Sequence, residues 1–268
     1  MNNARYYTIY ITGLLASILT IPASAEDEAE LAKKLQNPIA SLISVHLKLN
    51  WDTGIGPENV DNYVLNIQPV VPVSISEDTN LIVRTIIPII KAEAPVSGLD
   101  SESGLGDVLQ SFFFSPKNPT KTGWILGAGP VLLYPSASND VIGGEKWGAG
   151  PTAVVLKQDR GWTYGGLGNH VWSFAGNDRR NDISATFIQP FLSYTTKTFT
   201  TFGINTESTY GWEARQWTVP INLSISQLMK FGNQPVSFQL GARSYLERPE
   251  GGPDWGLSFT TTFLFPKS

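Results

Sequence analysis

Two histidines and the absence of cysteine limit the catalytic chemistry open to this 268-residue chain. A nucleophilic triad needs a base within hydrogen-bond reach of a serine, and a third group that orients the base. His170 follows Asn169 in "GLGNHVWSF", but neighbours in a strand point to opposite faces, and no sharp elbow presents a serine nearby. His46 lies in an alternating segment that predicts a strand. We therefore expect no enzymatic activity, and hydrolysis that disappears on His170→Ala would contradict this.

The acidic and glycine-rich stretches do not have the spacing of cofactor sites. "SNDVIGGE" and "NDRRND" are typical of solvated loops, while "GLGD" and "GWTYGGLG" lack the strand–helix context and the basic residue of a phosphate-binding loop. Without cysteine there are no disulfides and no thiolate metal sites. The net charge of −4 provides no basic surface for nucleic acid. We expect no metal, no cofactor and no nucleic-acid partner.

The first 25 residues have the pattern of a secretory signal peptide. One basic residue and an apolar stretch precede Ala23-Ser24-Ala25, an A-x-A cleavage site. A membrane-anchoring helix is the alternative, but the apolar stretch is short for a span. The sequence predicts a signal peptide over 1–25 and export of the rest.

A short helix is predicted directly after the cleavage site. "EDEAELAKKLQ" contains good helix formers, with acids first and Lys33 and Lys34 last, which matches the helix dipole. Pro38 then disrupts the helix. We assign 26–40 to a short helix that lies in the periplasm or plugs the structure that follows.

The region 41–268 alternates with a period of two. Val236, Phe238 and Leu240, for example, alternate with Gln239 and its polar neighbours. About twelve such segments of roughly 10 to 14 residues have the length that a tilted strand needs to cross a bilayer. No stretch of the mature chain has enough consecutive apolar residues for a membrane helix. The pattern predicts an all-β fold, an antiparallel transmembrane β-barrel of about twelve strands with a short N-terminal helix, whose apolar face is covered by lipid.

The connections and the tryptophans give two further signals. Longer connections alternate with tight turns, as in barrels with external loops and short periplasmic turns. Indole rings collect at the boundary between lipid and water, because the ring is apolar and its N–H needs a wet partner. All eight tryptophans are predicted to lie at strand ends and form interface girdles: Trp51, Trp124, Trp147, Trp162, Trp172, Trp212, Trp217 and Trp255.

Prolines within the predicted strands oppose this assignment, because a closed barrel has no edge at which a missing N–H is harmless. Bulges would accommodate one proline each. The alternative is a soluble, partly open β-sandwich whose edge strands hold the prolines: Pro69, Pro72, Pro88, Pro130, Pro151, Pro190 and Pro220.

In a barrel, the polar residues of the alternating segments face inward. Both charge signs occur among them, so that Arg84, Arg243 and Glu207 are candidates for an ion-pair network across the lumen. The residues predicted to line the lumen are His46, Lys48, Asn66, Gln68, Arg84, Asn205, Glu207, Asn222, Gln239, Arg243 and Glu247.

Several stretches carry a resemblance to a known family: "LQNPIASLIS", "LNIQPVVPVSI", "GLGDVLQSFFFSPK", "KWGAGPTAVVLKQ", "WTYGGLGNHVWS", "QPFLSYTTKTFTTFGINTESTY" and "GGPDWGLSFTTTFLFPK". From about Glu30 to Lys267 the chain resembles bacterial outer-membrane proteins labelled as transporters and linked by name to the meta-pathway of phenol degradation. The same label covers a barrel that secretes functional-amyloid subunits. The resemblance implies a twelve-stranded outer-membrane barrel that moves a substrate, and brings no catalytic or binding motif.

The sequence thus predicts a monomeric or trimeric channel of the bacterial outer membrane that conducts small solutes passively. The family name alone implies aromatic or apolar solutes. The alternatives are an export pore for a secreted polypeptide and a plugged structural or adhesion barrel. The expected partners are outer-membrane lipids, lipopolysaccharide, the barrel-insertion machinery, a small-molecule solute and further copies of the chain.

Overall fold

The computed structural model describes residues 25–96 and 100–266, with side chains from Glu28 onward. The predicted signal peptide lies outside these residues apart from Ala25. One helix, α1 (Ala25–Leu35), is present in the described ranges. No helix within them is long and apolar enough to cross a membrane.

The remainder of the described chain is a single β-sheet. Its segments, in chain order, are β1 (Ile43–Ile55), β2 (Val60–Ser74), β3 (Thr79–Ala92), β4 (Glu102–Leu105), β5 (Val108–Pro116), β6 (Trp124–Tyr134), β7 (Lys146–Asp159), β8 (Trp162–Gly176), β9 (Ser184–Thr195), β10 (Thr200–Thr206), β11 (Ser208–Gly211), β12 (Gln216–Phe231), β13 (Gln234–Glu247) and β14 (Trp255–Phe265).

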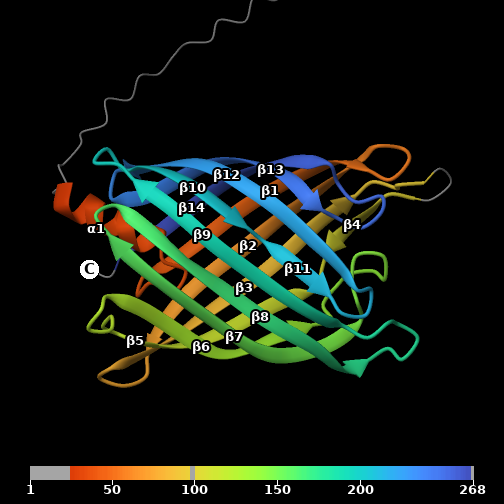
Figure 1. Cartoon of the computed structure of the whole chain (residues 1–268), viewed down its shortest axis with the longest axis horizontal. Helices are drawn as coiled ribbons and strands as arrows, with labels where there is room; N and C mark the ends of the chain where they lie inside the picture. Colours follow the sequence, from red (N-terminus) through yellow and green to blue (C-terminus); the bar gives the residue numbers. More distant parts are fainter. Residues whose placement is uncertain (1–24, 97–99, 267–268) are drawn as a thin grey trace, which may run out of the picture.

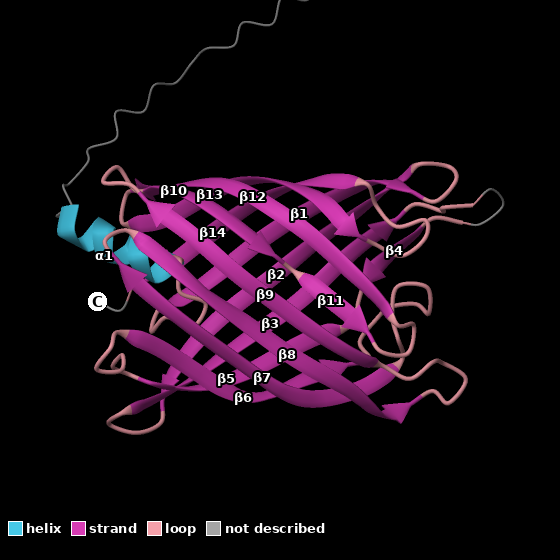
Figure 2. Ribbon diagram, in the orientation of Figure 1, coloured by secondary structure: helices cyan, strands magenta, loops and turns pink. Residues whose placement is uncertain are grey.

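The sheet closes on itself as an antiparallel barrel (Figure 2). The first strand, β1, pairs with both β2 and the last strand, β14. Two barrel strands are interrupted: β4 and β5 both pair with β3, and β10 and β11 both pair with β9 and β12. Counting each interrupted pair as one strand gives a closed barrel of twelve strands, which confirms the predicted fold class.

The two ends of the barrel differ. Helix α1 and the C-terminus lie at the same end (Figure 1). Tight turns occur at this end, such as Arg160–Gly161 between β7 and β8, where both residues have positive φ (46° and 85°), as a type I′ hairpin requires. Longer connections such as 135–145 lie at the opposite end. We call these the turn end and the loop end; in transmembrane barrels they face the periplasm and the outside.

The strand prolines lie where the hydrogen-bonded ladders are interrupted. The barrel can therefore close even though proline has no N–H to donate. Pro88 lies opposite the break between β4 and β5, and Pro190 lies opposite the break between β10 and β11. Pro220 lies at a register shift between β12 and β13. The barrel has no free edge, so the sandwich alternative is excluded. The other prolines are at positions where one ladder skips residues or ends: Pro69, Pro72, Pro130 and Pro151.

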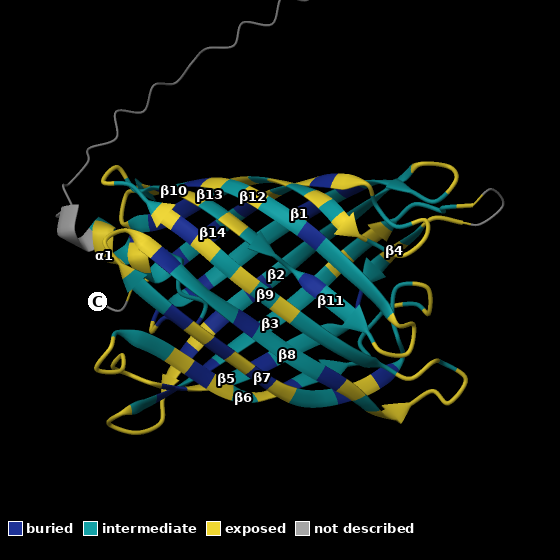
Figure 3. Cartoon of the chain, viewed as in Figure 1, coloured by how far each residue is buried: buried dark blue, intermediate teal, exposed yellow. Residues whose placement is uncertain are grey.

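The outer wall is apolar. Leu240 is 61% exposed, and its ladder partners Ile225 and Phe259 are exposed as well. Exposed and more buried residues alternate along the strands (Figure 3). No second layer of the described protein covers these side chains. Lipid hydrocarbon would cover this surface, which would otherwise be exposed to water.

Aromatic pairs occur near both ends of the strands. At the turn end, the ring centroids of Trp124 and Tyr164 are 5.8 Å apart, and Trp162 lies 4.9 Å from Tyr194. The loop end has more such contacts, including Trp51 with Trp255 at 5.4 Å. The tryptophans placed toward the loop end are Trp51, Trp147, Trp172, Trp212, Trp217 and Trp255. The tryptophans thus lie toward the two ends of the strands, and the predicted interface girdles require this placement.

The lipid-facing assignment predicts opposite results for two adjacent residues. We expect Leu240→Lys to destabilise the barrel by about 2–4 kcal/mol, the cost of a cation on the lipid face near mid-membrane. Gln239→Lys, one residue away on the inner face, should cost much less. Urea unfolding of each variant in lipid vesicles measures the difference. Equal destabilisation by both lysines would show that lipid does not cover the outer face.

A candidate solute site inside the barrel

A polar wall lines part of the barrel interior. Ladder pairing places His46 beside Gln68 and Thr262, and Lys48 beside Asn66 and Thr260. The His46 ring is held by hydrogen bonds to Ser44 Oγ (3.2 Å) and Thr262 Oγ1 (3.1 Å). The predicted lumen residues on this wall come from β1, β2, β3, β10, β12 and β13: His46, Lys48, Asn66, Gln68, Arg84, Asn205, Asn222, Gln239 and Arg243.

An ion cluster crosses the interior. Lys48 Nζ of β1 donates to Glu207 Oε1 at 2.6 Å, although β12, β13 and β14 lie between the strands that carry them. Arg243 Nη2 lies 3.8 Å from Glu207 Oε2, and Arg243 Nη1 lies 3.5 Å from Asp52 Oδ2. We call Lys48, Asp52, Glu207 and Arg243 the central ion cluster. The interruption between β10 and β11 falls at Glu207 itself, so the chain departs from the regular ladder where this side chain reaches across.

The sequence analysis missed part of this cluster. Asp52 was not among the predicted lumen residues, but β1 continues through it to Ile55. Asn50 accepts a hydrogen bond from Arg243 Nη2 at 2.6 Å, and the Tyr245 hydroxyl donates to Asp52 Oδ1 at 2.9 Å. The alternation that runs through Lys48 and Asn50 to Asp52 was the available signal. Glu247, by contrast, ends β13 in an exposed position.

The opposite part of the interior is apolar. Phe113 of β5, Val131 of β6 and Leu156 of β7 are completely buried, and Leu167 of β8 is 4% exposed. These residues point inward, whereas Val155, next to Leu156, is 42% exposed on the outer face. The interior therefore has one polar wall and one mainly apolar wall, called the apolar wall below, although Ser111 of β5 and Thr152 of β7 are also buried on it. No residue of this apolar wall was predicted to line the lumen.

The residues after α1 close the turn end of the barrel. We call Gln36–Leu42 the inserted segment. Ile39 is 3% exposed and packs in an apolar cluster with Val70, Ile82, Phe113, Val154, Leu156 and Leu167 of the wall. Ala40 and Leu42 pack with Ala32 of α1 and with Leu228 and Leu264. The helix lies across the mouth, where Figure 1 shows it.

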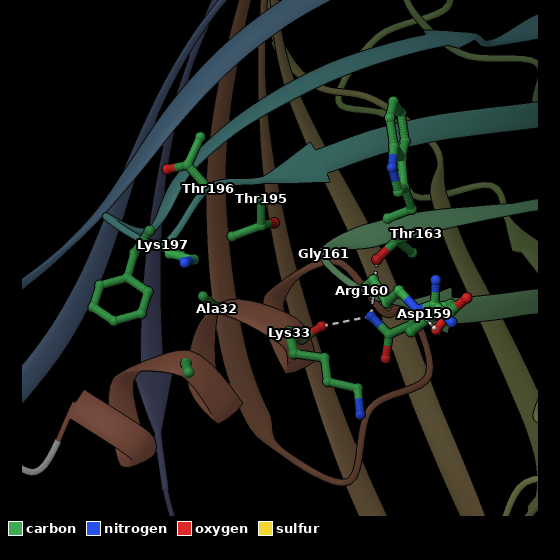
Figure 4. Close-up of a pocket in the computed structure, with 13 residues that line it drawn as sticks. Ala32, Lys33, Asp159, Arg160, Gly161, Thr163, Thr195, Thr196 and Lys197 are labelled. Atoms are coloured by element: carbon green, nitrogen blue, oxygen red, sulfur yellow. Dashed lines mark hydrogen bonds and ion pairs between the residues drawn. The ribbon is translucent and has the colours of Figure 1, made fainter.

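Few polar contacts attach this closure to the wall. Asn80 Nδ2 donates to Ser41 Oγ at 2.5 Å, and Gln158 Nε2 donates to the Lys33 carbonyl at 2.8 Å. A cavity of about 470 Å³ remains beside α1, with Ala32 and Lys33 on one side and Gly161 and Thr195 on the other (Figure 4). The closure is therefore mainly apolar packing, by a segment that is not a strand of the sheet.

A smaller cavity of about 200 Å³ lies above the inserted segment, and we call it the inner cavity. Leu35 of α1 and Gln36 and Pro38 of the inserted segment line it on the side of the turn end. Among the described residues that line this cavity, Arg84 is the single residue with a permanently charged side chain. Both polar and apolar residues line it: His46, Gln68, Val70, Arg84, Gln189, Phe191, Leu192, Ser193, Gly203, Ile204, Asn205, Ser224 and Gln239.

His170 lies on the outer wall, away from this cavity. Its ring packs against Trp172 at a centroid distance of 4.0 Å with the ring planes tilted by 47°, and its Nδ1 lies 2.7 Å from Thr186 Oγ1. Trp212 Nε1 donates to the same hydroxyl at 2.8 Å. Within the described residues His170 Nε2 has no hydrogen-bond partner, so no carboxylate orients this ring. In the same part of the chain, no three His, Cys, Asp or Glu side chains gather as metal ligands.

Solved structures share the barrel architecture. An outer membrane channel from Pseudomonas putida F1 superposes with a TM-score of 0.65 at 15% identity, over 84% of this chain and 96% of that chain. Outer membrane phospholipase A from Escherichia coli gives 0.48 at 9% identity, over 82% and 92% of the two chains. OmpT from Vibrio cholerae gives 0.39 at 8%, over 83% and 98%. No protein-family model and no curated protein matches the sequence.

The first of these likenesses shows the fold, which is that of a bacterial outer-membrane β-barrel. The apolar outer wall and the aromatic residues near both ends fit that membrane. The fold that the family resemblance implied is confirmed, and membership of the family stays a prediction.

Proposed function

We propose that the chain is an outer-membrane channel that conducts small solutes passively and is shown here with its turn end closed. The observation that carries this proposal is the unfilled, partly ionic interior. A barrel of about eight strands is just filled by its own side chains, and larger barrels leave space. This twelve-stranded barrel retains an inner cavity, and the element that closes it is separate from the sheet.

Three further points support the proposal. The resemblance to transporters linked by name to phenol degradation implies transport of aromatic or apolar solutes. The structure from Pseudomonas putida F1 is described as a channel. The apolar wall around Phe113 and Leu156 suits a solute with an apolar body. The proposed surroundings are outer-membrane lipids and lipopolysaccharide, after insertion by the barrel-insertion machinery, with further copies of the chain as an open option.

A plugged structural barrel is the second candidate, and the tight burial of Ile39 favours it. The inner cavity of about 200 Å³ is too small for an extended polypeptide, so the export pore has less support. We propose no enzymatic role, because the described partners of His170 are a threonine hydroxyl and aromatic rings.

Single-channel recording in planar bilayers tests the channel proposal. A mature chain whose folding is verified by heat-modifiable gel migration should produce steady unitary current steps of low conductance. The steps should be small because the inserted segment, even when displaced from its closed position, still narrows the turn end. Folded protein that inserts into the bilayer and never conducts would identify a structural barrel instead.

A further inference from the structure

We propose that Arg84 is the recognition point of the inner cavity and binds the carboxylate of a small solute with an apolar body. This inference rests on the proposed function, because it names the class of solute that the channel takes. It is carried by the charge of the cavity, by the free hydrogen-bonding capacity of Arg84 and by the apolar residues beside it.

The interior carries an excess of positive charge at this point. Lys48, Arg84 and Arg243 contribute three positive charges, and Asp52 and Glu207 contribute two negative charges, which leaves one positive charge. Both carboxylates are engaged by Lys48 and Arg243. Among the residues whose side chains are described, no carboxylate lies within 4.0 Å of the Arg84 guanidinium. The chain as a whole has a net charge of −4, so the local positive charge is opposite in sign to the net charge of the protein.

Arg84 is held in place while most of its donors stay available. Its Nη2 donates to Gln68 Oε1 at 3.0 Å, which fixes the side chain from the neighbouring strand β2. A guanidinium has five N–H donors in a planar fork, and this fork matches the two oxygens of a carboxylate. Within the described part of the chain the contact with Gln68 is the one side-chain hydrogen bond of Arg84. Arg84 is half-buried and Glu207 is its nearest source of negative charge, beyond ion-pair distance. Keeping a cation out of water without a direct ion pair is costly, and a bound anion would offset that cost.

Apolar residues line the same cavity. Val70, Phe191 and Pro38 contribute to its walls together with Arg84. Val70 also belongs to the apolar cluster around Ile39, and Phe191 packs against that cluster. A fully hydrated inorganic anion would gain nothing from these side chains, whereas a carboxylate on an apolar body would bury that body against them. At about 200 Å³ the cavity is smaller than pockets for drug-sized ligands, roughly 300–1,000 Å³, so the solute has about one ring or a short branched chain.

Equilibrium binding of benzoate to the detergent-solubilised, folded barrel tests this inference. Benzamide is the ligand control, because it has nearly the same shape without the charge. The variants are Arg84→Gln, Arg84→Lys and, as the matched control, Arg179→Gln in an exposed loop. Heat-modifiable migration verifies that each variant folds. We expect the wild type to bind benzoate at least about tenfold more tightly than benzamide.

Arg84→Gln should lose about tenfold or more in benzoate affinity and leave benzamide binding unchanged. Arg84→Lys should lose less, and Arg179→Gln should bind as the wild type does. Equal affinity for the two ligands, or unchanged benzoate binding in Arg84→Gln, would overturn the inference. A barrel that conducts but does not bind benzoate refutes this solute class and leaves the channel intact. Arg84-dependent binding by a barrel that never conducts supports the site and refutes the channel.

Discussion

A mature chain that begins at Ile43, and therefore lacks α1 and the inserted segment, is expected to conduct severalfold more current per open channel than the chain that begins at Glu26. Removing Ile39 takes away the side chain that fills the apolar cluster at the turn end. Hydrophobic constrictions block conduction by excluding water, so widening this one should admit a continuous water column. Single-channel recordings of both chains under the same salt conditions measure the ratio.

The Ile39→Ala variant is the matched control for the truncation. It keeps the inserted segment and its contact between Ser41 and Asn80, but it loses most of the packed side chain. Replacing a buried isoleucine by alanine typically costs about 2–5 kcal/mol, and here the cost falls on the closure. We expect more frequent openings than in the wild type. A folded truncated barrel with wild-type conductance would show that the inserted segment does not limit flow.

Glu207→Gln is expected to shift ion selectivity toward anions. Glu207 lies 2.6 Å from Lys48 Nζ and 3.8 Å from Arg243 Nη2, so its charge balances both cations. Neutralising it raises the excess positive charge of the interior from one to two. The reversal potential in a potassium chloride gradient measures the shift toward chloride. The variant should also unfold more easily, by roughly 3 kcal/mol at most, because breaking a buried ion pair leaves charges unpaired.

Glu247→Gln is the matched control for this variant. Glu247 is an exposed glutamate at the loop end of β13, outside the central ion cluster. The same loss of one negative charge should leave the reversal potential and the unfolding midpoint nearly unchanged. Equal shifts in both variants would show that overall charge, rather than the central ion cluster, sets the selectivity.

The fold could be predicted because most strands have one polar and one apolar face. In β13, Leu240 and Gln239 differ in type as well as in orientation, so a period of two is visible without any structure. The strand count followed from the same contrast. Pro88 and Pro190 seemed to contradict the predicted strands, because a proline lacks the N–H that a ladder needs. The ladder breaks that accommodate them lie on the neighbouring strands. The residue pattern of one strand does not show where its neighbours pair with it.

The apolar wall could not be predicted, because its strands lack this contrast. Val154 is 3% exposed on the inner face and Val155 is 42% exposed on the outer face, yet the two residues are identical in type. Neighbouring glycines and alanines in β6 to β8 carry no polarity either. As a result no residue of the apolar wall was predicted to line the lumen, and the amphipathic character of the interior was missed.

The central ion cluster depends on barrel closure and was predicted only in outline. Glu207 and Arg243 were named as partners, but the close contact of Glu207 is Lys48, 159 residues away in sequence. Arg84, the third residue named, contacts Gln68 instead. Which inward residues meet across a lumen depends on its width and on strand tilt, and local alternation contains neither.

A reversible cross-link between the inserted segment and the wall tests the central claim most directly. The chain has no cysteine, and Ser41 Oγ lies 2.5 Å from Asn80 Nδ2, so the pair Ser41→Cys and Asn80→Cys is joined selectively by a short, reducible methanethiosulfonate linker. If the inserted segment closes a solute channel, cross-linking abolishes the current steps and reduction with dithiothreitol restores them in the same bilayer. Identical currents before and after reduction of a verified cross-link would contradict this account.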